Sequence, residues 1–256
     1  MQEIKVIQSP SKEKPFVIVQ KPSGLFSAPL KENEKNNALF QTAKLFPEIL
    51  SVSGLYKQIE YGLLHRLDTQ TEGLLLIATT QEFYDFLQEE QKNGRFFKYY
   101  EANCHYVPNN ANILQGFPSL PPQAQFLFLK NKKEQKQDFV LKSFFRNYGK
   151  NSKTVRPVLQ SSGMAALKKI EKKQEYFTQI SLCKENNFET FKAKCKISLG
   201  FRHQVRCHLA WCGFPVIGDS LYNSEYKNDD EQLQFRATAL EFKNPITNEI
   251  EVYTYK

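Results

Sequence analysis

The segment from residue 62 to residue 73, Gly-Leu-Leu-His-Arg-Leu-Asp-Thr-Gln-Thr-Glu-Gly, gathers side chains that could take part in chemistry. It places His65, Arg66 and Asp68 together just before an aliphatic run, and its two terminal glycines allow tight backbone geometry. A carboxylate in such a loop can serve as a nucleophile. An isolated Arg-x-Asp is more often a structural ion pair, so the spacing alone leaves both interpretations open.

A second polar cluster lies on an expected helix from about residue 202 to residue 212, which Gly213 and Pro215 would end. Val205 and Leu209 recur at helical spacing and mark the face that packs. Several of the polar residues should therefore point toward a groove or toward solvent. The cluster comprises Arg202, His203, Gln204, Arg206 and His208.

The same helix contains two His/Cys pairs at a spacing of four residues, His203 with Cys207 and His208 with Cys212. Such pairs can bind zinc, but the two are offset by five residues and face different directions. We expect no metal site here. The five cysteines contain no CxxC pair, which predicts reduced structural thiols rather than a disulfide framework.

The elements that must position these side chains follow from the apolar periodicity. A strand is expected at Phe16–Val19 and a helix at about 39–46. A buried strand is expected at Leu74–Thr79 and a second helix at 81–93. Thr80 should cap the second helix and Gly94 should end it. A closing hairpin is expected at Phe235–Phe242 and Ile250–Tyr255.

The clearest strand is Phe191–Ile197, where apolar residues alternate with Lys192, Lys194 and Lys196. This lysine face could bind phosphates, or the three side chains could simply be solvated. A surface insertion is expected at about 130–173, where 13 Lys or Arg stand against three acidic residues. A solvated basic loop and an RNA-contacting arm are equally compatible with that stretch.

Length, composition and net charge restrict the class of protein only broadly. A chain of 256 residues with 41% apolar residues can bury a substantial core, and its net charge of +8 favours an anionic partner. The first ten residues contain no apolar core of a secretory signal, and the longest aliphatic stretch is too short to span a bilayer. A cytoplasmic protein without a membrane partner is expected.

Five segments, in order, resemble the RluA-type pseudouridine synthases. They are the opening strand with its Lys-Pro-x-Gly turn (16–25), the His-Arg-Leu-Asp segment with its aliphatic run (65–76), a Lys-x-Tyr-x-Ala strand (98–102), the His-Gln-Val-Arg-x-His-Leu segment with its extension (200–222), and the closing hairpin (237–247). Two departures are Glu72, where the family commonly has a small serine, and Phe201-Arg202 in place of the usual pair before His203.

The resemblance implies an α+β fold with a mixed, largely antiparallel central sheet flanked by helices and loops. It implies isomerisation of uridine to pseudouridine in rRNA or tRNA, without a cofactor. The chain is expected to be a single catalytic domain over residues 1–256, with the basic insertion and with no S4-like domain before it. It should act on RNA as a monomer.

The resemblance also assigns roles to residues. Asp68 would act as nucleophile at C1′ or as base at C2′, and Arg206 would keep it ionised. Tyr100 would stack under the uracil. A target in folded RNA must be flipped out, with Arg66 filling the vacancy and His65 supporting it. The remaining RNA contacts would come from Arg202, His203 and Gln204.

Two other functions compete with this one. A catalytically silent RNA-binding protein could keep the same scaffold, but the intact set of Asp68, Tyr100 and Arg206 argues against it. A glycoside hydrolase could use Asp68, yet such enzymes use two carboxyl groups. Glu72 is the only other carboxylate in the motif, which argues against hydrolysis.

Overall fold

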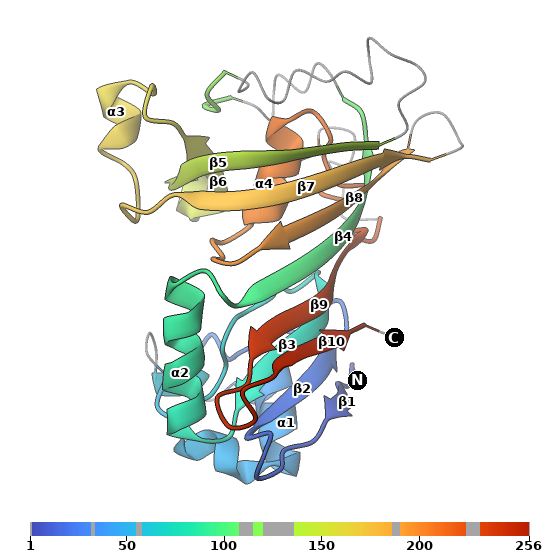
Figure 1. The fold of residues 1–256 in the computed structure, drawn as a ribbon. Coiled ribbons are helices and arrows are strands. Elements are labelled where there is room, and N and C mark those ends of the chain that lie inside the picture. The colour runs from blue at the N-terminus through green and yellow to red at the C-terminus, as the bar shows by residue number, and fades with distance from the viewer. Residues whose placement is uncertain are drawn as a thin grey trace. The chain divides into compact units, whose positions relative to one another are not determined.

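The computed structural model describes residues 2–31, 34–54, 58–107, 115–119, 136–185, 190–223 and 231–255 (Figure 1). Within what the sequence predicted as one catalytic domain, the chain forms two compact units. Unit 1 comprises Met1–Tyr99 and Arg236–Lys256, and unit 2 comprises Tyr100–Phe235. No helix among these described residues is long and apolar enough to cross a membrane.

The sheet of unit 1 has the strand order β1-β2-β3-β9, with β10 paired to β9. Its neighbours are antiparallel except for β3 and β9, which are parallel. The long pairing of β2 with β3 runs from Phe16 opposite Ala78 to Lys21 opposite Gly73. The bounds are β1 Lys5–Gln8, β2 Phe16–Lys21, β3 Glu72–Ala78, β9 Phe235–Lys243 and β10 Ile250–Thr254.

Two α-helices belong to unit 1, α1 (Ala38–Leu45) and α2 (Gln81–Lys92), together with the short 3-10 helices η1 (Pro47–Ser51) and η2 (Gln58–Glu60). The Thr80 hydroxyl accepts the Phe83 N–H at 3.3 Å, which satisfies one of the free donors at the start of α2. Gly94 follows α2 with a φ of 72°. Both expected ends of this helix are therefore confirmed.

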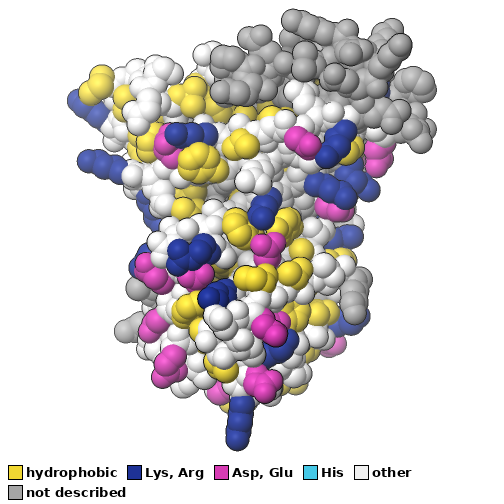
Figure 2. Space-filling model, viewed as in Figure 1, with side chains coloured by type: hydrophobic (Ala, Val, Ile, Leu, Met, Phe, Trp, Pro, Cys, Tyr) yellow, Lys and Arg dark blue, Asp and Glu magenta, His cyan; other side chains and the backbone are white. Residues whose placement is uncertain are grey.

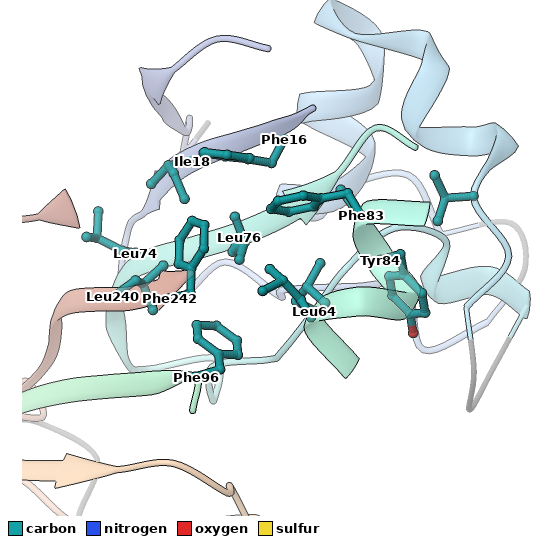
Figure 3. Packing of buried hydrophobic residues seen from close by; sticks show 13 residues of the cluster. Phe16, Ile18, Leu64, Leu74, Leu76, Phe83, Tyr84, Phe96, Leu240 and Phe242 are labelled. Carbon is teal, nitrogen blue, oxygen red and sulfur yellow. The ribbon is translucent and has the colours of Figure 1, made fainter. Parts of the chain in front are cut away.

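The core of unit 1 is an aromatic and aliphatic cluster between the sheet and α2 (Figure 3). Phe16 stacks on Phe83 with ring centroids 4.9 Å apart, and Phe242 meets Phe16 edge to face at 5.3 Å. Such offset and edge-to-face contacts add to the free energy gained by burial. The cluster also takes in the aliphatic run of β3, so the strand that follows Asp68 is anchored in the most buried part of unit 1.

The sheet of unit 2 has the strand order β4-β8-β7-β5-β6. The β5–β6, β5–β7 and β7–β8 pairs are antiparallel, so the fold is α+β with a mixed, mostly antiparallel sheet, as expected. The bounds are β4 Phe97–His105, β5 Lys136–Tyr148, η5 Lys150–Ser152, β6 Thr154–Val158, α3 Met164–Leu167, β7 Tyr176–Lys184, β8 Thr190–Ile197 and α4 Gln204–Trp211.

The sequence predicted a basic surface insertion at about 130–173, of which residues 130–135 lie outside the described residues. Its status as an insertion stays a prediction. From Lys136 onward the chain forms β5, η5, β6 and α3, and β5 lies between β7 and β6 in the unit 2 sheet. The exposed side of β5 includes the apolar Val140 and its buried side includes the polar Ser143, which obscures the alternation. The adjacent Phe144 and Phe145 are both buried, which breaks the period of two.

Candidate active site

Asp68 lies in the loop that leads into β3, and its side chain is partly exposed next to the buried Leu67. The Asp68 carbonyl accepts the Thr71 N–H at 3.0 Å, closing a tight turn. Gly73 follows with a φ of 135°, and a Cβ atom there would collide with the carbonyl oxygen of Ala237 on β9. Glycine is therefore required where this loop enters the sheet.

A second loop, residues 21–27, holds the Asp68 loop by its backbone. The Ser27 hydroxyl donates to the Leu67 carbonyl at 2.8 Å and accepts the Leu67 N–H at 3.0 Å. The Gly24 N–H donates to the Thr69 carbonyl at 2.8 Å. The Ser23 hydroxyl donates to the Gln70 carbonyl, also at 2.8 Å. The backbone on both sides of Asp68 is thus fixed by hydrogen bonds.

Lys21, the last residue of β2, begins the 21–27 loop and bonds to its backbone. The sequence predicted only a turn at this residue. Its ammonium is fully buried and donates to the carbonyls of Pro22, Leu25 and Thr69 at 3.0, 2.8 and 3.0 Å. Burial lowers the pKa of Lys21 to about 8, and the negative charges of Asp68 and Glu72 oppose that shift. Lys21 therefore places a cation in the electrostatic environment of Asp68.

His65 and Arg66 precede Asp68 in different environments. His65 accepts the Leu76 N–H through Nε2 at 3.4 Å and meets Phe96 edge to face at 5.8 Å. Burial, with a further effect of Lys98, lowers the pKa of His65 to about 3, so the imidazole is neutral and held against β3. Arg66 is exposed and pairs with Glu60 at 3.1 Å, an ion pair that can open at little cost.

Lys98 is a second buried cation of unit 1. Its Nζ atom donates to Gln91 Oε1 at 2.7 Å and lies 4.8 Å from the centre of the Phe96 ring. Burial lowers the pKa of Lys98 to about 7. His65 and Lys98 therefore contact the same aromatic ring. The family resemblance includes Lys98 in its third segment but gives it no role.

In unit 2, Tyr100 on β4 is buried and stacks on Phe235, with ring centroids 5.2 Å apart and an interplanar angle of 8°. The stacking fixes the plane of the phenol ring. The expected role of Tyr100 under a uracil stays a prediction.

Arg206 on α4 forms a buried, bidentate ion pair with Asp219. The Nε atom lies 2.8 Å from Oδ2 and the Nη2 atom lies 2.7 Å from Oδ1. The Asp219 carboxylate also accepts the N–H groups of Leu221 and Tyr222. This fork fixes the position of the guanidinium. Sequence reasoning gave Asp219 no role, although the residue stands directly after Gly218 in the fourth of the family-like segments.

The residues at the start of α4 have distinct contacts. The buried Gln204 side chain accepts the Phe201 N–H and donates to the Phe177 carbonyl and the Thr178 hydroxyl, so its amide bonds within the protein. His203 has a left-handed backbone with a φ of 56°, and its Nδ1 atom lies 3.1 Å from the Tyr222 hydroxyl. Arg202 is exposed and donates to oxygens of Asn147, Ser152 and Thr154.

The three lysines of β8 lie on the partly exposed side of that strand, as the alternation predicted. Lys192 lies 3.7 Å from Glu185 and Lys194 lies 3.8 Å from Glu101. On the face drawn in Figure 2, basic and acidic side chains are likewise intermingled. A phosphate approaching Lys192 or Lys194 would have to compete with a carboxylate.

The candidate residues thus belong to two sets. Unit 1 holds His65, Arg66 and Asp68, with Lys21 beside Asp68. Unit 2 holds Tyr100, Arg206 and the RNA-binding candidates, with Asp219 beside Arg206. The joining of the two sets around one substrate stays a prediction. Across the described ranges, no group of three or more His, Cys, Asp or Glu side chains could hold a metal ion.

Comparison with known proteins identifies relatives over most of the chain. A family model described as RNA pseudouridylate synthase matches residues 15–211. A Mycoplasma pneumoniae protein described as an uncharacterized RNA pseudouridine synthase is 26% identical over 91% of this chain and 61% of its own length. The dual-specificity RNA pseudouridine synthase RluA of Vibrio parahaemolyticus is 26% identical over 90% of this chain and 75% of its own length. The chain thus spans about three fifths of the Mycoplasma relative.

A solved structure has the same fold. Human RNA pseudouridylate synthase domain containing 4 superposes with a TM-score of 0.61 and covers 98% of this chain and 87% of its own. At 16% sequence identity, this likeness concerns the fold alone.

Proposed function

Because this chain belongs to the RNA pseudouridylate synthase family, of the RluA type, we propose that it converts uridine in RNA to pseudouridine. The observation that carries the proposal is the Asp68 loop, whose backbone is fixed on both sides by the 21–27 loop. A carboxylate on such a loop is pre-positioned for reaction, which is where an enzyme gains much of its rate. We propose RNA of the ribosome or tRNA as substrate, and a cytoplasmic monomer as the acting form.

The proposed reaction breaks the bond between uracil N1 and ribose C1′, turns the base and forms a bond between C5 and C1′. The proton on C5 leaves and N1 ends protonated, so nothing is oxidised and no group enters the product. Asp68 acts either as nucleophile at C1′ or as base at C2′. The same proposal assigns Tyr100 and Arg206 of unit 2 to the reaction, with Tyr100 stacking under the uracil and Arg206 keeping the Asp68 carboxylate ionised.

Access to a uridine in folded RNA requires base flipping, which costs a few kcal/mol. Arg66 is suited to replace the flipped base because its side chain is exposed and its ion pair with Glu60 is at the surface. His65, which is neutral and bonded to the β3 backbone, is suited to hold the Arg66 backbone in place rather than to contact phosphate.

The decisive measurement is tritium release from RNA labelled at uridine C5, taken from a host that lacks the gene. Wild-type protein should release tritium without added metal or cofactor. Asp68→Asn removes the negative charge with almost no change in size, and the rate should fall by at least about a thousandfold while RNA binding persists. Asp85→Asn is the matched control, since Asp85 is an exposed carboxylate on α2.

Two results would contradict the proposal. If wild-type protein releases no tritium from total rRNA and tRNA but binds them, the alternative of a catalytically silent RNA-binding protein gains the support. If Asp68→Asn keeps the wild-type rate, the reaction does not use the Asp68 carboxylate.

A further inference from the structure

We propose that the β5–β6 hairpin, residues 144–158, docks the phosphate backbone of the RNA that flanks the target uridine. This inference rests on the proposed function and names a binding surface for its substrate. The hairpin joins Phe144 of β5, opposite Val158 of β6, to Tyr148 opposite Thr154 through the turn at η5. It is part of the sheet of unit 2, with α4 packed against β6 (Figure 1).

All charged side chains of the hairpin are positive. Residues 144–158 contain no acidic residue and four basic ones, Arg146, Lys150, Lys153 and Arg156. The lysines at the turn, Lys150 and Lys153, are exposed. This differs from β8, where Lys192 and Lys194 each lie near a carboxylate. A surface of unbalanced positive charge fits a polyanion such as RNA.

Two arginines face each other across the hairpin, Arg146 on β5 opposite Arg156 on β6. Like charges directly opposite one another destabilise a strand pair, and Arg146 contributes to lowering the pKa of Arg156, after burial as the main cause. Both guanidiniums lie over the Tyr148 ring, 5.0 and 4.3 Å from its centre. Arg156 is buried and donates to the carbonyls of Gln115 and Val155, so a bound anion would meet Arg146 and be attracted by both charges.

The hydrogen-bonding capacity of the Arg146 guanidinium is only partly used within the described residues. Its Nη2 atom donates to the Gly116 carbonyl at 3.1 Å, but its Nε atom is buried and has no acceptor among the described residues. An unsatisfied buried donor is costly. The Arg146 side chain as a whole is partly exposed, and arginine is well shaped to bind a phosphate through its accessible guanidinium edge.

Arg202 fixes the hairpin to the start of α4. Its Nη2 atom donates to Asn147 Oδ1 at 2.9 Å, to the Thr154 carbonyl at 3.3 Å and to the Ser152 carbonyl. Two residues further on, α4 begins, and it carries the candidate Arg206. The departure from the family pattern at Phe201-Arg202 thereby gains a physical role, since Arg202 links the docking surface to the helix of the proposed site.

The experiment compares two variants that each remove three positive charges. Arg146→Gln/Lys150→Gln/Lys153→Gln changes the hairpin, and Lys5→Gln/Lys12→Gln/Lys35→Gln changes exposed lysines of unit 1. Binding of fluorescein-labelled total rRNA and tRNA is followed by anisotropy over a range of salt concentrations, in the Asp68→Asn background. Tritium release is measured in parallel with Asp68 intact.

The hairpin variant should bind at least tenfold more weakly near physiological salt. Its slope of log affinity against log salt should be shallower by about 0.7 to 0.9 for each phosphate that the hairpin no longer neutralises. KM should rise at least tenfold and kcat should change less than threefold. The control variant should stay within threefold in every measure. If Arg146→Gln prevents folding, Lys150→Gln/Lys153→Gln tests the same slope.

Failure of this inference is distinguishable from failure of the proposed function. Turnover by wild type, together with a hairpin variant that matches the control in slope and KM, overturns the inference alone. RNA binding that depends on the hairpin, without tritium release by wild type, overturns the proposed function alone. Phosphatidylglycerol vesicles serve as a third probe: hairpin-dependent binding to vesicles but not to RNA would also overturn the inference.

Discussion

At the scale of single residues, the Arg206–Asp219 pair decides how a guanidinium is presented in unit 2. The Arg206 and Asp219 side chains are 3% and 0% exposed, so neither charge is solvated by water. Removing one partner from a buried pair leaves the other uncompensated, whereas changing both can cost much less. Stability and catalysis are therefore coupled at this position. Arg206 is proposed to take part in the reaction, and it is held in place by Asp219, which has no proposed catalytic role.

We expect Asp219→Asn to lower the free energy of unfolding by about 3 to 5 kcal/mol, although the amide oxygen can still accept the Leu221 and Tyr222 N–H groups. Arg206→Gln should cost a similar amount. The double variant should lose clearly less than the sum of the two, as measured by urea unfolding in a double-mutant cycle.

Arg66→Gln is the control for this cycle. Its ion pair with Glu60 is exposed on the arginine side, and its removal should change stability by less than about 1 kcal/mol. Additive effects at Arg206 and Asp219 would show that the two side chains are not energetically coupled, contrary to the geometry.

At the scale of elements, the rigidity of the Asp68 loop comes from a partner loop about 40 residues earlier. Ser27 and Ser23 both bond to its backbone, but Ser27 is buried and makes two hydrogen bonds with Leu67, whereas Ser23 is less buried and makes one with Gln70. The two serines thus allow a comparison between a buried side chain and a partly exposed one that both bond to the Asp68 loop.

Ser27→Ala should leave the Leu67 N–H and carbonyl without their partner and cost about 1 to 3 kcal/mol of stability. Because Asp68 is the next residue, kcat for tritium release should fall roughly tenfold or more through misplacement of the carboxylate, with KM nearly unchanged. Ser23→Ala should change kcat less than twofold. A Ser27→Ala enzyme with normal kcat but reduced thermal stability would limit Ser27 to a structural role.

Elements with a clear apolar period could be predicted from the sequence: β2, β3, α2, β8, α4 and the β9–β10 hairpin all lie close to their expected positions. The stretch that forms β5 and β6 could not be predicted, because β5 exposes Val140 and buries the adjacent Phe144 and Phe145, so it lacks a clear alternation. The buried residues that hold the site residues in place could not be predicted from the sequence either. Contacts such as Ser27 with Leu67, or Arg206 with Asp219, arise only when the chain folds.

At the scale of the whole molecule, each unit contains a histidine whose pKa is strongly lowered by burial. His65 in unit 1 bonds to the β3 backbone. His208 in unit 2 is fully buried, with Ser143 Oγ 2.9 Å from Nε2 and Thr178 Oγ1 2.8 Å from Nδ1. Burial lowers the pKa of each to about 3. Both imidazoles are therefore neutral in the folded protein over the physiological range.

Acid should therefore destabilise both units. A histidine in the unfolded chain has a pKa near 6.5, so between about pH 6.5 and pH 3 the unfolded state binds more protons than the folded state. The stabilisation is complete above pH 6.5 and declines as the pH falls toward 3. At pH 5 the decrease due to His208 alone should be about 2 kcal/mol, and that due to the partly exposed His65 should be smaller.

His208→Gln tests this without introducing a charge. The variant should be less stable than wild type at pH 7.5, because glutamine cannot reproduce both hydroxyl contacts and the stacking of His208 on Phe145. Its free energy of unfolding should fall by about 2 kcal/mol less than that of wild type between pH 7.5 and pH 5, as measured by urea unfolding at both values. His105→Gln, at a partly exposed site on β4, serves as control. Equal pH dependence of His208→Gln and wild type would mean that His208 titrates normally in the folded protein.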